Sequence, residues 1–81
     1  MKFIVFQPTQ KKEFSISWLE VQTPVGSFVI QPGHAPIVLT VQQEKAIIIM
    51  LTSGKQEIIP IGRSGGLIEI NRNKITLLLN S

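Results

Sequence analysis

Residues 13–22 read EFSISWLEVQ, and this stretch decides the fold class. Apolar residues occupy every second position from Phe14 to Trp18, which is the pattern of a strand with one buried face. The alternation then shifts by one position, so that Leu19 and Val21 are the apolar residues. One extra residue near Trp18 and Leu19 accounts for this shift, and it predicts a β-bulge or bend there.

The remainder of the chain has the same strand-like composition, rich in Val, Ile, Thr and Phe. It predicts further strands at residues 28–30, 37–41, 46–52, 56–61, 67–70 and 74–79. Turn-forming Gly, Pro, Asn and Ser separate them at residues 23–26, 31–33, 53–54, 64–66 and 71–73. No window of about eleven residues or more has a helical period. We therefore predict an all-β fold, a flattened antiparallel β-sandwich or barrel of two packed sheets, in a single domain over residues 1–81.

The composition excludes several classes of protein. With 43% hydrophobic and only 16% charged residues, the 81-residue chain is not a disordered tail. The absence of cysteine argues against a disulfide-bonded secreted scaffold and excludes a thiolate metal site. The longest apolar run, residues 46–51, is far shorter than the roughly 20 residues of a membrane-spanning helix. We interpret the net charge of +3 mainly as a contribution to solubility.

The residue types that carry out catalysis are nearly absent from the sequence. His34 is the one histidine, and without Cys or Asp it lacks the companions of a metal site or a catalytic triad. The glycine-rich stretch 62–66 does not have the order of a phosphate-binding P-loop, so it is interpreted as a turn. The sequence therefore predicts no enzyme activity, no catalytic residue, no metal and no cofactor.

Residues 46–51 are apolar on both faces of the predicted strand. Ile47, Ile49 and Leu51 point one way, and Ala46, Ile48 and Met50 point the other way. Residues 77–79 repeat this on a smaller scale. Only one face of a sandwich strand meets the core, so the other face packs under another part of the chain or binds another protein.

Two motifs give the chain a resemblance to a known family. Residues 26–36 read GSFVIQPGHAP, and about thirty residues later residues 65–71 read GGLIEIN. In order and spacing they resemble the N-terminal domain of the epsilon subunit of F-type ATP synthases, over nearly all 81 residues. The resemblance implies a flattened β-sandwich in a non-catalytic central-stalk (rotor) subunit. Such a subunit binds the gamma subunit and the c-ring and helps couple proton flow to ATP synthesis.

The resemblance also implies contact residues for each partner. The predicted gamma-binding residues are Pro32, Gly33, His34, Ala35, Pro36, Ile49 and Met50. The predicted c-ring loop comprises Pro24, Val25, Gly26, Ser27 and Phe28, in which Ser27 replaces the acidic residue common in the family. The family's C-terminal helical hairpin has no counterpart in the 81 residues, so we predict neither inhibition of hydrolysis nor nucleotide binding.

Such a subunit would lie at a membrane only indirectly, through the complex. The expected location is the cytoplasmic face of the bacterial inner membrane, with an organelle as the other possibility. Two other functions stay open at this stage. One is an epsilon-like scaffold outside the synthase, and the other is a small OB-type nucleic-acid-binding barrel, prompted by the size and the pI of 9.7. Because the aromatic residues fall mostly at core-phase positions of the first third, the sequence favours a protein partner over nucleic acid.

Overall fold

The computed structural model describes residues 1–23, 26–42 and 45–79, and it contains strands and no helix over those residues. The all-β prediction is therefore confirmed. The strands are β1 (Lys2–Gln7), β2 (Gln10–Thr23), β3 (Gly26–Ile30), β4 (His34–Val41), β5 (Ala46–Leu51), β6 (Gln56–Pro60), β7 (Gly66–Arg72) and β8 (Lys74–Leu79).

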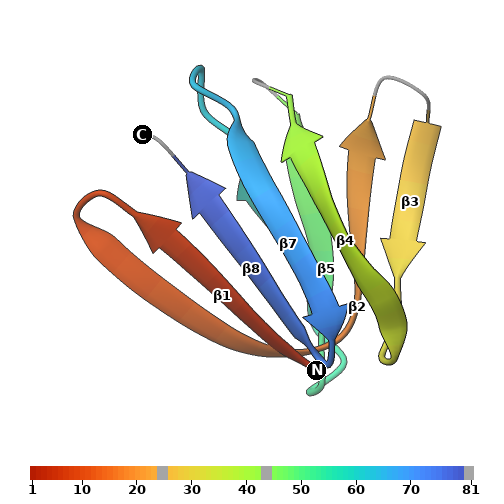
Figure 1. Ribbon diagram of the computed structural model, residues 1–81. Helices are drawn as coiled ribbons and strands as arrows, with labels where there is room; N and C mark the ends of the chain where they lie inside the picture. Colours follow the sequence, from red (N-terminus) through yellow and green to blue (C-terminus); the bar gives the residue numbers. More distant parts are fainter. Residues whose placement is uncertain (24–25, 43–44, 80–81) are drawn as a thin grey trace.

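The strands form one curled sheet that folds into two layers. Along the sheet the order is β4-β7-β8-β1-β2-β5-β6, and β3 pairs with β2 outside this path. The first half of β2 pairs with β1, and its second half pairs with β3 and β5, so β2 passes from one layer to the other (Figure 1). All pairs are antiparallel except β1 with β8, which is parallel.

A β-bulge in β2 accounts for its change of layer. Ile16 pairs with Leu51, but the next pair is Trp18 with Met50, so Ser17 is the extra residue. The predicted bulge is therefore present, just before Trp18. Its consequence is that the Trp18 side chain lies half-buried on the outer face, instead of joining Ile16 in the core.

The core lies between the two layers and is built from Phe3 and aliphatic side chains at alternate positions. It includes Phe3, Val5, Ile16, Leu19, Val21, Ile30, Val41, Ile47, Ile49, Ile61, Ile68, Ile70, Ile75, Leu77 and Leu79. Phe14 packs against this cluster, with its ring stacked on Phe3 at 5.9 Å between centroids. No polar or charged side chain is buried among the described residues. Each large apolar side chain taken fully out of water stabilises the fold by roughly 1.5–3 kcal/mol.

Two of the predicted element boundaries differ in the structure. β4 begins at His34, directly after the predicted turn at residues 31–33 and three residues before the predicted start at residue 37. Between β7 and β8 the turn is reduced to Asn73, because Arg72 adopts a positive φ of 54° that reverses the chain within a single step. The turn predicted at residues 23–26 includes residues 24 and 25, which lie outside the described residues.

Gly66 occupies a position where no side chain fits. A Cβ atom there would lie 2.8 Å from the Leu78 carbonyl oxygen and 2.9 Å from the Leu79 Cδ2. Gly66 pairs with Val41 on one side and Leu79 on the other, so its own backbone is held by two strands. The close approach of β7 to β8 thus requires glycine at this position.

We expect Gly66→Ala to lower the free energy of unfolding by about 1–3 kcal/mol, because the backbone oxygen cannot move away without breaking the ladder. Urea unfolding followed by circular dichroism measures this. The exposed Ser64 serves as the control, since Ser64→Ala should change stability by no more than about 0.5 kcal/mol. Equal stability of Gly66→Ala and the native chain would contradict the close approach.

Candidate partner-binding surface

The predicted motif at His34–Pro36 lies at the start of the edge strand β4. His34 pairs with Arg72 and Ile37 pairs with Ile70, so β4 carries one residue more than β7 over this interval. This is a second β-bulge, and Pro36 lies within it on a strand with a free edge, where the missing N–H is tolerated. The turn before it is made possible by Gly33, whose φ is +84°.

The half-buried His34 ring is held by its own neighbour. Its Nδ1 lies 2.7 Å from the Ala35 carbonyl oxygen, and a hydrogen bond there requires the proton on Nδ1. In the neutral imidazole the Nε2 atom is then the acceptor. The histidine thus rigidifies the bulge, and its contact with gamma stays a prediction.

A shallow hollow of about 440 Å³ adjoins this bulge on the outside of β4 and β7. It is lined by Pro36, Ile37, Val38, Glu69, Ile70 and Asn71. Val38 is 57% exposed, although it is an aliphatic residue in the middle of a strand. The hollow therefore offers an apolar contact next to the carboxylate of Glu69.

An apolar row continues from the hollow across the same outer face. Leu67 on β7, Leu78 on β8 and Phe6 on β1 are direct neighbours in the strand register. Their exposed fractions are 38%, 44% and 38%. We call these residues the outer apolar row. At its far end the Lys11 ammonium lies 5.6 Å from the centre of the Phe6 ring and 3.2 Å from a Glu13 carboxylate oxygen.

The opposite layer also has an apolar outer face, formed by β3, β2, β5 and β6. Its members are Trp18, Val29, Ile48, Met50 and Ile58, with Glu20 between Val29 and Ile48 in the register. We call this the second outer face. The two-sided apolar character predicted for β5 is confirmed, since Ile47 and Ile49 are in the core while Ala46, Ile48 and Met50 remain half-exposed.

This arrangement changes the predicted set of gamma-binding residues. The prediction for Ile49 is wrong, because its side chain is completely buried in the core and offers no atom to a partner. Met50 is accessible, but it lies on the second outer face, in the other layer from His34–Pro36. The predicted residues therefore fall on two separate surfaces.

The predicted c-ring loop is described from Gly26 onward, and Pro24 and Val25 lie outside the described residues. Ser27 and Phe28 are exposed, with Phe28 44% exposed opposite the buried Val21. β3 runs from Gly26 at one end of the sandwich to the Pro32–Gly33 turn at the other (Figure 1). The two predicted contact segments thus lie at opposite ends of one short strand.

Charged residues do not gather into a metal-binding cluster in the described part of the chain. Over those residues no group of three or more His, Cys, Asp or Glu side chains is placed to hold a metal ion. Nor does any of them form a helix of the length and hydropathy needed to cross a bilayer. The accessible chemistry of this surface is apolar packing with a few flanking charges.

Residues 1–81 match the family described as ATP synthase, Delta/Epsilon chain, beta-sandwich domain. The match spans the whole sequence and agrees with the two-layered all-β fold. The chain belongs to this family. The delta/epsilon β-sandwich domain is thereby established for this protein, and the resemblance drawn from the two sequence motifs is confirmed.

A solved structure shares the fold of this delta/epsilon domain. It comes from the cryo-EM structure of Euglena gracilis mitochondrial ATP synthase, OSCP/F1/c-ring in rotational state 1. The TM-score is 0.83 at 15% sequence identity, over 98% of the present chain and 49% of the matched chain. At this identity the likeness concerns the fold, and the present chain spans about half the length of the chain that it matches.

Sequence reasoning missed most of the outer apolar row of the domain. The two-sided run at residues 77–79 indicated that Leu78 faces outward, which the structure confirms with Leu77 at 0% and Leu78 at 44% exposure. No local sequence pattern indicates that Leu78 lies beside Phe6 and Leu67, because these residues become neighbours only through the register of β1, β7 and β8.

Leu77 and Leu78 form a matched pair for testing which face stabilises the fold. We expect Leu77→Ala to lower the free energy of unfolding by about 2–5 kcal/mol, because it leaves a cavity in the core. Leu78→Ala should cost less than about 1 kcal/mol, since its side chain is already partly in water. Urea unfolding of both variants measures the difference, and similar losses would show that the outer row belongs to the core.

Proposed function

We propose that the chain is a non-catalytic central-stalk subunit of an F-type ATP synthase, which binds gamma with one sheet face and the c-ring with one end. The observation that carries this proposal is the apolar surface formed by the outer apolar row and the β4 hollow. This surface is continuous with His34–Pro36, and its large apolar side chains are exposed to water. In a domain of an ATP synthase family, such an exposed apolar surface is suited to binding another subunit.

The proposed gamma contact is the outer face of β4, β7, β8 and β1. Val38 and the outer apolar row supply the apolar part of this surface, Glu69 lies beside Val38 in the register, and Lys11 lies at the far end of the row. Such a centre surrounded by polar groups is typical of protein interfaces, in which a few well-packed apolar residues account for most of the affinity. His34 and Pro36 extend the same surface to the end of β4.

The proposed c-ring contact is the end of the sandwich where β3 begins, through Ser27 and Phe28. Ser27 carries no charge, so this contact would depend on packing and neutral hydrogen bonds. Contacts at one end and on one face of a rigid sandwich would tie the c-ring to gamma. The domain would then transmit rotation without taking part in the chemistry, and it would lie at the membrane only through the complex.

We expect Leu78→Glu to weaken binding to purified gamma about tenfold or more, because it places a carboxylate in the apolar centre of the interface. Isothermal titration calorimetry with gamma from the same organism measures this. Met50→Glu, on the second outer face, is the control and should bind gamma as the native chain does. Loss of binding in Met50→Glu alone would move the gamma site to the second outer face.

The c-ring contact is testable by crosslinking, since the chain contains no cysteine. We expect Ser27→Cys, carrying a short photoactivatable crosslinker, to couple to subunit c in the assembled synthase. Ser53→Cys, in the turn between β5 and β6 at the other end of the sandwich, should not couple to it. Coupling from Ser53 and not from Ser27 would reverse the proposed orientation of the domain.

A further inference from the structure

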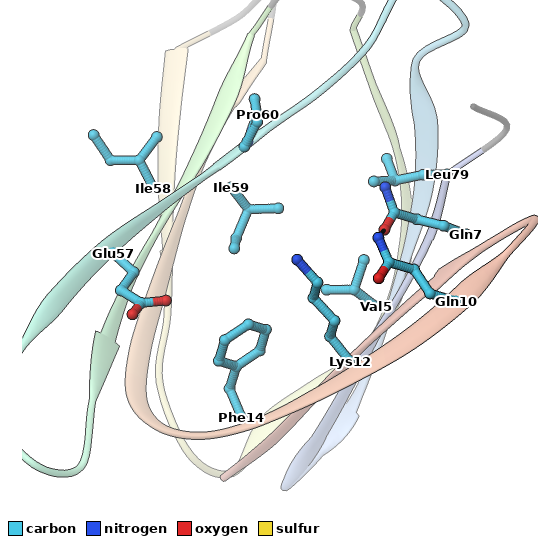
Figure 2. Close-up of a pocket in the computed structure, with 10 residues that line it drawn as sticks. All are labelled: Val5, Gln7, Gln10, Lys12, Phe14, Glu57, Ile58, Ile59, Pro60 and Leu79. Atoms are coloured by element: carbon cyan, nitrogen blue, oxygen red, sulfur yellow. Dashed lines mark hydrogen bonds between the residues drawn. The ribbon is translucent and has the colours of Figure 1, made fainter.

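The sandwich is open on one side, where the first half of β2 faces β6. Neither edge is paired with another strand there, because β6 ends the sheet and the first half of β2 pairs with β1 only. Between them lies a cavity of about 370 Å³, whose lining shares Ile58 with the second outer face and no residue with the outer apolar row (Figure 2). Its size is in the lower part of the range of about 300–1,000 Å³ that is typical of small-molecule sites.

The floor of this cavity is apolar and belongs to the core. Val5 and Leu79 are nearly buried, whereas Phe14 and Ile59 pack against the core cluster but are only partly covered. The Phe14 ring and the Ile59 side chain both point into the open space (Figure 2). An apolar group placed between them would remove exposed core surface from water.

The β1–β2 side of the cavity carries a cation that points inward. Lys12 pairs with the buried Val5, so its side chain is on the inner face, and its ammonium reaches into the cavity (Figure 2). The adjacent Lys11 is on the outer face and pairs with Glu13, whereas Lys12 has no ion-pair partner in the described part of the chain. A lysine directed between the layers with no counter-ion is available to an anion.

Amide groups lie beside this cation. The Gln10 Nε2 donates a hydrogen bond to the Gln7 Oε1 at 2.9 Å, which leaves the Gln7 amide N–H groups free to donate to a ligand. On the β6 side the one ionic group is Glu57, which pairs with the buried Ile49 and therefore also faces inward. Donors are thus concentrated on the β1–β2 side, and the negative charge is on the other side.

We propose that this cavity binds a small anionic amphiphile, a medium-chain carboxylate. Its head group lies on Lys12 and the Gln7 amide, and its apolar tail lies between Phe14 and Ile59. Glu57 fixes the orientation, because a carboxylate head is repelled from the β6 side. The net charge of +3 adds a weak general attraction for the anion.

Titration of the ¹⁵N-labelled chain with monomeric octanoate tests this proposal by NMR. We expect saturable shifts in the amides of β1, the first half of β2 and β6. Lys12→Gln should weaken binding about fivefold, because the charged hydrogen bond at the mouth is lost. Lys11→Gln is the matched control on the other face and should bind octanoate as the native chain does. Glu57→Gln should bind octanoate more tightly than the native chain.

Three outcomes would overturn the proposal. Shifts centred on Trp18, Leu67 and Leu78 would mean that octanoate binds to the outer apolar faces. Equal affinities for octanoate and the neutral octanol would remove the role of the charge. Unchanged octanoate affinity in Lys12→Gln would remove the role of Lys12, provided that the spectrum shows the variant folded.

Discussion

Strand β2 hydrogen-bonds in both layers of the sandwich, and the single extra residue Ser17 makes this possible. Side chains alternate along a strand, so a continuous β2 that buried Ile16 would direct Leu19 and Val21 to the solvent. The bulge resets the phase, and both halves of β2 then present apolar residues to the same core. β1 pairs with the first half of β2 and β8 pairs with β1, whereas β3 and β5 pair with the second half of β2. The positions of these strands in the two layers therefore depend on the bulge.

Large apolar side chains remain on both outer faces of the two layers. The described residues form only strands, and no helix among them covers either face. Residues such as Val38, Leu78 and Ile58 are therefore 57%, 44% and 62% exposed, even though they lie in regular strands. This exposure is unfavourable for an isolated domain, and it is the kind of surface that association with another protein buries.

Local patterns in the sequence were sufficient for β2 to β8, the bulge and the two faces of β5, because alternation and turn residues act over a few positions, but they did not predict β1 (Lys2–Gln7). They were insufficient for register. The outer apolar row joins residues 6, 67 and 78, and the parallel pairing of β1 with β8 that aligns them leaves no local signal. Ile49 and Met50 show the same limit, since both are apolar neighbours in one run and only the fold places one in the core and the other outside.

The free edges of the sheet indicate how partners are recognised. The Ile61 N–H donates to the Lys45 carbonyl oxygen, and the Leu51 N–H donates to the Lys55 carbonyl oxygen. Because hydrogen-bonded and non-hydrogen-bonded residue pairs alternate between β5 and β6, Pro60 lies in a pair that is not hydrogen-bonded. Its backbone nitrogen therefore faces the free edge. Pro36 lies in the bulge of the other terminal strand, β4. Proline on an edge and an inward lysine such as Lys12 both oppose the addition of a further strand. The edges are therefore protected while the faces remain apolar, which favours binding by packing of side chains on a sheet face over extension of the sheet.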